Sequence, residues 1–401
     1  MKSSLEVADI FHTFGGAYLA QYGDQTSREQ RRAMRAIEVC RTAELGGHVD
    51  ACDSCGQVRI SYNSCRNRHC PKCQTLDKER WLEAQAEALL PIPYFHVVFT
   101  LPQELGPLAL RNPQGVYALL FKAASQTLLE LGRDPQHLGA DIGVTALLHT
   151  WSQTLMYHPH LHCIVTGGGL SEEGPEWIEG RKAFFLPVKV LSRLFRGKLL
   201  SYLKKAHQAD ALIFPGTIAA WKDERFFQEQ LTALYQKEWV VYCKPPLGRP
   251  EQVLGYLARY THRVALTNDR ILRVEEDQVT FRYRDSQDHN RIKEMTLDAV
   301  EFIRRFLRHV LPDRFVKIRH YGLLSNRKRK VSMQKSKELL GMAPSVAKAP
   351  RPRSTWQELL ERLTGTDPMC CPHCGKGKMV TRQFLLPLED RASPFPVKQA
   401  L

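Results

Sequence analysis

The run His158-Pro159-His160-Leu161-His162 restricts the local fold more than any other part of this 401-residue chain. Successive side chains of a β-strand point to opposite faces, so the three histidines share one face while Pro159 and Leu161 share the other. Imidazole is a common ligand of divalent metals, and the histidine face can bind an ion. The alternative is a cluster of histidines whose ring nitrogens make only hydrogen bonds. In both cases the face of the strand that carries Pro159 and Leu161 can pack.

The pattern of apolar residues around this run predicts a mixture of helices and strands. Helices are expected within residues 1–47, where the sequence from Ser27 resembles a capping box, and over Val116–Leu131. Strands are expected at three segments, namely Tyr94–Leu101, which should be buried, Val144–Trp151 and Met156–Thr166. The histidine run therefore lies inside an alternating pattern of strand and helix.

The eleven cysteines cluster in CxxC pairs, which in a chain of this size favours metal binding over disulfides. Cys52-x-x-Cys55 and Cys70-x-x-Cys73 are separated by fourteen residues, close to the spacing of a four-cysteine zinc ribbon. Four thiolates leave no open coordination position. The zinc predicted at these cysteines is therefore structural and linked to folding.

Other residues of this cysteine-rich module leave alternatives open. Cys65 and His69 could replace one of the four cysteines, form a second metal site or simply pack, and packing is the first interpretation of His48. The basic stretch from Arg66 to Lys72 suits a surface that faces nucleic acid, and it equally suits a solvated loop.

A further pair, Cys371-x-x-Cys374, looks like half of a zinc ribbon whose other half is missing. It could recruit the adjacent Cys370 or His373, or it could pair with another chain. The remaining interpretation is a turn without metal.

The net charge of +15 creates a positive field that attracts polyanions, so nucleic acid is the expected partner and a membrane surface comes second. The first residues lack the basic and apolar regions of a secretory signal. The most apolar segment, Leu89–Leu101, is short and contains two prolines, which argues against a membrane span. We therefore expect a cytoplasmic protein.

Tyr256 and Tyr260 are four residues apart, so a helix presents both hydroxyl groups on one face. Arg259, His262 and Arg263 surround them with positive charge. Taken alone, such a pair is typical of core packing. Beside a histidine strand in a basic chain it instead indicates nucleophiles, because nearby cations and a metal-polarised phosphate let a phenol attack.

Several motifs resemble those of HUH endonucleases. His160-Leu161-His162 is similar to their histidine-hydrophobic-histidine signature, Tyr256-x-x-x-Tyr260 resembles their two-tyrosine motif, and Phe99-Thr100-Leu101 resembles the first strand motif of rolling-circle initiators. Together with the cysteine module and the segment Tyr321–Asn326, and in this order, they resemble bacterial two-tyrosine rolling-circle insertion-sequence transposases. The resemblance covers most of the chain.

The resemblance implies an α+β fold, with an HUH endonuclease-like antiparallel sheet flanked by helices and preceded by a helical, zinc-ribbon-like domain. It implies that His160 and His162 bind magnesium or manganese, with His158 as a candidate third ligand. One tyrosine would cleave single-stranded DNA at an element end, keeping a 5′-phosphotyrosine and releasing a 3′-hydroxyl. The second tyrosine would attack the target or the other end.

Three domains are predicted: residues 1–90 as a helical, zinc- and DNA-binding domain, 91–324 as the catalytic domain, and 325–401 as a basic tail with the last CxxC motif. Contacts with DNA are expected from a set of basic residues, comprising Arg259, His262, Arg263, Arg327, Lys328, Arg329 and Lys330. For the arginines beside the tyrosines the alternative is a solvated helix face. The family implies a bacterial, nucleoid-associated protein.

Two other functions fit part of the pattern. A rolling-circle replication initiator or conjugative relaxase shares the histidines and tyrosines, but such proteins often carry a helicase, and this chain contains no GxxxxGK[ST] loop. A zinc-ribbon DNA-binding regulator without nuclease activity needs the cysteines and the charge, but neither His160 nor the tyrosine pair.

Overall fold

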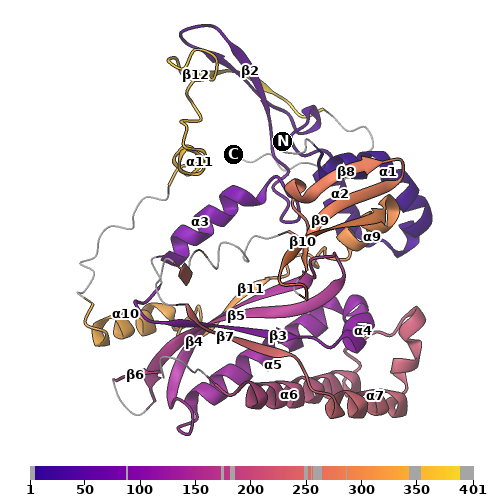
Figure 1. The fold of residues 1–401 in the computed structure, drawn as a ribbon, viewed down its shortest axis with the longest axis vertical. Helices are drawn as coiled ribbons and strands as arrows, with labels where there is room; N and C mark the ends of the chain where they lie inside the picture. Colours follow the sequence, from indigo (N-terminus) through magenta and orange to yellow (C-terminus); the bar gives the residue numbers. More distant parts are fainter. Residues whose placement is uncertain are drawn as a thin grey trace. The chain divides into compact units, whose positions relative to one another are not determined.

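The computed structural model describes residues 5–86, 89–172, 176–180, 186–247, 252–253, 255, 264–285, 287–342 and 354–388. The chain divides into two compact units. The first unit is assembled from Met1–Arg80, His262–Val310 and Pro352–Leu401, and the second from Trp81–Thr261 and Leu311–Arg351. Each unit therefore joins segments that are far apart in the sequence (Figure 1).

The first unit combines helices with two three-stranded antiparallel sheets, ordered β12-β1-β2 and β10-β9-β8. Its described elements are α1 (Val7–Tyr22), η1 (Gly23–Gln25), α2 (Arg28–Glu38), η2 (Ala43–Leu45), β1 (Gly47–Cys52), β2 (Val58–Tyr62), η5 (Asn268–Arg270), β8 (Ile271–Glu275), β9 (Gln278–Asp285), β10 (Arg291–Asp298), α9 (Ala299–Leu307), α11 (Trp356–Thr364) and β12 (Met379–Leu385). The helix α3 (Gln74–Ala86) runs from this unit into the second.

The amino-terminal helices form as their sequence predicts. The capping box before α2 is confirmed, since Ser27 and Gln30 each accept a hydrogen bond from the other's backbone N–H. Phe11 of α1 meets Phe306 of α9 edge to face, with ring centroids 5.4 Å apart. This contact ties the amino-terminal helix to a helix about 290 residues later in the sequence.

The second unit is built on one antiparallel sheet, ordered β11-β4-β5-β3-β7, with β6 also paired to β5. Its described elements are β3 (Tyr94–Thr100), η3 (Gln103–Leu105), α4 (Gly106–Arg111), α5 (Pro113–Arg133), β4 (Ala140–Trp151), β5 (Tyr157–Ser171), β6 (Trp177–Glu179), α6 (Val188–Gln208), η4 (Gly216–Lys222), α7 (Glu224–Gln236), β7 (Val241–Leu247), β11 (Ile318–Gly322) and α10 (Arg329–Leu339). The three strands predicted around the histidines are confirmed as β3, β4 and β5.

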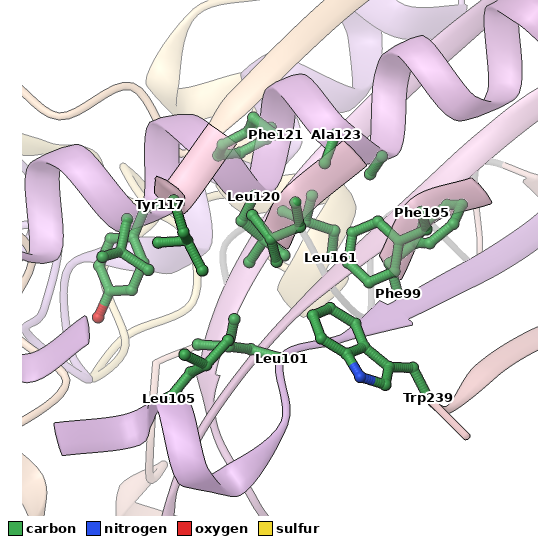
Figure 2. Packing of buried hydrophobic residues seen from close by; sticks show 14 of the residues in the cluster. Phe99, Leu101, Leu105, Tyr117, Leu120, Phe121, Ala123, Leu161, Phe195 and Trp239 are labelled. Carbon is green, nitrogen blue, oxygen red and sulfur yellow. The ribbon is translucent and has the colours of Figure 1, made fainter. Parts of the chain in front are cut away.

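One face of this sheet packs against α5 and α6 (Figures 1 and 2). Leu161 and Cys163 of β5 point to this face and are fully buried, which confirms the apolar side predicted for the histidine strand. Phe99 of β3 and Phe195 of α6 meet there with ring centroids 4.8 Å apart. Burying each large apolar side chain contributes roughly 1.5–3 kcal/mol, so this core holds the strands rigidly.

A smaller buried cluster lies on the opposite face of the sheet. It includes Tyr94 of β3, Ile164 of β5, Leu324, and Met333 of α10, together with Val253. The predicted α+β class, with antiparallel sheets flanked by helices, is confirmed. Within the described part of the chain, every helix is too short or too polar to cross a membrane.

Candidate metal centres

The histidine run lies in β5, between β4 and β3. The register of β4 with β5 places His149 directly opposite His160, and the register of β3 with β5 places Val98 opposite His162. His96 lies two residues before Val98, on the same face of β3. Four histidines from three adjacent strands therefore share the face of the sheet that α5 and α6 do not cover.

Three of these imidazoles converge on one point. Ring nitrogens of His149, His160 and His162 all lie within 4.8 Å of one another. The Nε2 atoms of His160 and His162 are 3.1 Å apart, and the rings of His149 and His162 have centroids 4.7 Å apart. Nitrogens bound to one divalent ion at about 2.1 Å are roughly 3.0–3.4 Å from each other. The three residues therefore fit a shared metal ion and leave its other positions open.

Burial keeps His160 in the neutral form that binds metals. It lowers the pKa of His160 to about 4, and Nδ1 of this residue lies 2.7 Å from the backbone oxygen of His158. Donation from Nδ1 to that oxygen leaves the lone pair of His160 on Nε2, at the point of convergence. Burial also lowers the pKa of His96 to about 3, so that its neutral ring can accept a hydrogen bond from His162.

His158 does not belong to the group of three. Its ring is exposed and its centroid lies 5.2 Å from that of His160. The structure places His149 in the group, a residue that the sequence analysis did not single out. A histidine inside a predicted strand was visible in the sequence, but the register between the two strands was not.

The tyrosine pair and the basic residues beside it, namely Tyr256, Arg259, Tyr260, His262 and Arg263, lie outside the described residues. The described residue Val253 precedes Tyr256 by three positions. Val253 is fully buried in the cluster that includes Tyr94 and Ile164. Ile164 follows His162 by two residues in β5, so Val253 lies on the histidine face of the sheet.

Four cysteines converge in a first cluster at the end of α2 and before α3, and they are Cys40, Cys65, Cys70 and Cys73. The Sγ atom of Cys73 lies 3.5 Å from that of Cys40 and 3.6 Å from that of Cys65. Sulfurs bound tetrahedrally to zinc at 2.3 Å are about 3.8 Å apart. All four sulfur atoms lie within 4.8 Å of one another, which fits a shared zinc ion.

A second cluster joins Cys52 and Cys55 to Cys371 and Cys374. The Sγ atoms of Cys52 and Cys374 are 3.7 Å apart, as are those of Cys55 and Cys371. The last CxxC pair therefore meets another pair of the same chain, an arrangement that was not among the alternatives considered for it. The sulfur positions of both clusters therefore suit a structural zinc ion.

The structure thus does not bring the four predicted zinc ligands together as one set. Cys52 and Cys55 lie in the second cluster, while Cys70 and Cys73 lie in the first with Cys65 and with Cys40, which the sequence analysis missed. Cys40 has no CxxC partner, so spacing gave no indication of it.

The histidines near the cysteine clusters are not part of either group of four cysteines. His48 pairs with Asp50 at 3.4 Å, and Nδ1 of His373 lies 4.0 Å from the Cys55 sulfur. The backbone N–H of His69 donates to the Asn67 side chain at 2.9 Å. None of these three histidines belongs to a group of converging ligand atoms within the described residues.

The predicted basic segment lies at the start of α10. Arg327, Lys328 and Lys330 are exposed, and Arg329 is half-buried. Their charges are therefore available to a polyanion.

Two family models match the chain: one described as "Transposase zinc-binding domain" over residues 10–101, and one described as "Putative transposase" over residues 143–331. The chain is 50% identical over 383 residues to "Putative transposase y4qJ" of Sinorhizobium fredii (strain NBRC 101917 / NGR234), a match that covers 95% of each protein. It is 27% identical over 368 residues to the "Transposase for insertion sequence element IS801" of Pseudomonas savastanoi pv. phaseolicola, covering 91% of this chain and 86% of that one.

Proposed function

The chain belongs to the two-tyrosine insertion-sequence transposases of the IS91 and IS801 type, and from this premise we propose that it nicks and joins single-stranded DNA through 5′-phosphotyrosine intermediates. The observation that carries this proposal is the convergence of His149, His160 and His162 on one face of a rigid sheet. In this reading the ends of an insertion sequence are cut and joined by rolling-circle transposition.

The three imidazoles would hold a magnesium or manganese ion. When bound, this ion polarises the scissile phosphate and withdraws negative charge from its oxygens. The strands fix the three rings before DNA arrives, because the opposite face of β5 is locked into the core by Leu161 and Cys163. Three ligands leave room for phosphate oxygens and water, which both of these ions prefer.

The nucleophile in this proposal is the hydroxyl of Tyr256 or Tyr260. The phenol oxygen forms a bond to phosphorus and gives up its proton to solvent, while the bond from phosphorus to the 3′-oxygen breaks and that oxygen takes up a proton. A phosphodiester is exchanged for another phosphodiester, so a DNA 3′-hydroxyl can reverse the step without ATP. The position of Val253 on the histidine face supports a nucleophile that reaches this site from the segment that follows it.

The partner in this proposal is DNA, and the net charge of +15 supports it. The arginines and the histidine beside the tyrosines would neutralise the phosphates that flank the cleaved bond. The exposed residues Arg327, Lys328 and Lys330 would add affinity that does not depend on sequence.

Covalent adducts on end-labelled single strands, with magnesium or manganese present, test the function. We expect adducts with the unmodified chain and none with the double variant. In the single variants Tyr256→Phe and Tyr260→Phe, the DNA should be attached to the tyrosine that remains. Adducts that persist in the double variant would contradict the tyrosine assignment. Sequence-selective binding without any cleavage would instead favour a regulator that only binds DNA.

A matched pair of histidine variants tests the metal ligands. His149→Ala removes a converging ligand and is expected to lower the adduct yield about 100-fold, on the order of the loss from one key catalytic interaction. His158→Ala removes an exposed ring outside the group and is expected to leave most of the yield. Equal losses in the two variants would contradict the proposed ligand set.

A further inference from the structure

The second cysteine cluster is made of two loops with the same local geometry. Each loop has the sequence Cys-x-x-Cys-Gly, and its glycine has a positive φ, +74° at Gly56 and +65° at Gly375. In each loop the glycine N–H donates to the backbone oxygen of the first cysteine, at 3.1 Å and 2.9 Å respectively. Two such turns facing each other are the arrangement of a zinc ribbon with four thiolate ligands.

Backbone N–H groups point at the sulfur atoms of both loops. The N–H of Cys55 donates to the Cys52 sulfur, and the N–H of Gly377 donates to the Cys374 sulfur, both at 3.4 Å. Donors arranged in this way stabilise thiolates, the form of cysteine that binds zinc.

The two loops also bind each other directly. The N–H of Lys378 donates to the Asp53 carboxylate at 2.8 Å, and the N–H of Asp53 donates to the backbone oxygen of Lys378 at 3.0 Å. Gly377 passes so close that a Cβ there would lie 2.7 Å from the Asp53 carboxylate and would also strike the Cys52 sulfur. Only glycine lets the backbone approach the cluster in this way.

Apolar packing at this end of the sheet is sparse. The buried apolar cluster around the loops contains Met379 and, apart from it, only cysteines of the group, namely Cys52, Cys371 and Cys374. Yet β12 pairs along the whole of β1, from Gly47 to Cys52. This core is too small to hold together two loops that are 316 residues apart in sequence. In small domains of this kind, a bound metal ion supplies the stabilisation that the core lacks.

We propose that Cys52, Cys55, Cys371 and Cys374 bind a zinc ion of their own, distinct from the one suited to the Cys40 cluster. This second zinc fastens the segment after residue 354 to β1, so the final strand of the described chain completes the amino-terminal sheet. Neither matched family model includes Cys371 or Cys374, because these models end at residues 101 and 331. The proposal does not depend on the catalytic function.

Zinc content of the purified full-length chain tests this proposal. We expect about two zinc ions per chain in the unmodified protein and about one in the Cys371→Ser, Cys374→Ser double variant. Cys370→Ser is the matched control, since Cys370 is adjacent but outside the cluster, and it is expected to retain both ions. A double variant that keeps the full zinc content would overturn the proposal, as would an unmodified chain that binds only one.

Thiol labelling of the unmodified chain tests the proposal without a substitution, so the result does not depend on whether the double variant folds. Cys55 is exposed and Cys374 is half-buried, so burial does not protect either thiol from alkylation. We expect zinc to protect both, with Cys370 still labelled, and a chelator to expose Cys52, Cys55, Cys371 and Cys374 together. Labelling of Cys55 and Cys374 at the rate of Cys370 in the zinc-loaded chain would overturn the proposal.

Discussion

Nδ1 of His162 lies 2.9 Å from Nε2 of His96, and the two imidazole rings stack with centroids 5.1 Å apart. His96 is buried in β3 and neutral at neutral pH, because burial lowers its pKa to about 3. When His162 donates to it, the lone pair of His162 stays on Nε2, facing His160. His96 therefore orients a proposed metal ligand without belonging to the converging group.

The first prediction removes this acceptor. His96→Phe keeps a buried ring of similar size and is expected to weaken Mn²⁺ binding about 10- to 100-fold, the usual cost of losing an outer-shell partner. His96→Gln provides an amide oxygen and should recover part of the affinity. Titration calorimetry with Mn²⁺ measures the effect, and melting without metal controls for folding. Unchanged affinity in the Phe variant would show that His96 does not orient His162.

The second prediction concerns the close approach of Gly377 to Cys52. Gly377→Ala is expected to displace the loop from the cluster and to lower zinc content by about one ion per chain, because the new Cβ has no space. The control is Gly197→Ala in the middle of α6, where a Cβ meets nothing within 4 Å. That variant should gain about 0.5–1 kcal/mol of stability from helix propensity. Zinc analysis of both variants measures whether an ion is lost, and thermal melting measures the change in stability.

How far the sequence predicts the site depends on whether the candidate metal ligands lie on one strand. His160 and His162 are two residues apart, so strand periodicity alone places them together. His149 comes from the neighbouring strand, and it meets His160 only through a register that the pattern does not specify. The same limit applies to Cys40, which has no partner at CxxC spacing.

The division of the cysteines between two clusters has a similar cause. Spacing predicts which cysteines form a loop, as with Cys52 and Cys55, but it does not predict which loops meet. Cys371 lies more than 300 residues from Cys55 and reaches it because β12 joins the sheet of β1. The local elements were predictable, since capping and periodicity are local, whereas the pairing of distant segments depends on tertiary packing.

The third prediction is a pH dependence at Glu301, in the first turn of α9. Burial acts to raise the pKa of this carboxyl, but hydrogen bonds from Arg304 and Arg305 outweigh it and lower the pKa from its ordinary 4.5 to about 2. The unfolded chain then binds more protons between these values, so the stabilisation is present above pH 4.5 and is lost as the pH falls towards 2.

Glu301→Gln should therefore destabilise the chain by roughly 0.5–1 kcal/mol at pH 7, and the difference from the unmodified chain should shrink below pH 4.5. Denaturant unfolding at a series of pH values measures it. Glu294→Gln is the control, because its ion pair with Arg273 is largely exposed and contributes little. A difference that grows as the pH falls would have the wrong sign for this mechanism.

The last prediction concerns the basic start of α10. Changing Arg327, Lys328 and Lys330 to Gln removes three exposed charges from one short segment. Each phosphate contact on a single strand contributes about 0.7 to the slope of log affinity against log salt, so loss of all three contacts should flatten the slope by roughly 2. Binding of unrelated single-stranded sequences should weaken equally, since phosphate contacts carry no sequence information.

A matched variant separates local contacts from net charge. Lys204, Lys205 and Lys222 are also exposed, and changing these three to Gln lowers the net charge of the chain by the same amount. If the segment at α10 contacts DNA, only the variant at Arg327, Lys328 and Lys330 should flatten the salt slope by roughly 2. Charges more than about 10 Å from the DNA are screened and release few counterions. Equal flattening in both variants would mean that DNA responds to the overall charge and that α10 has no special role.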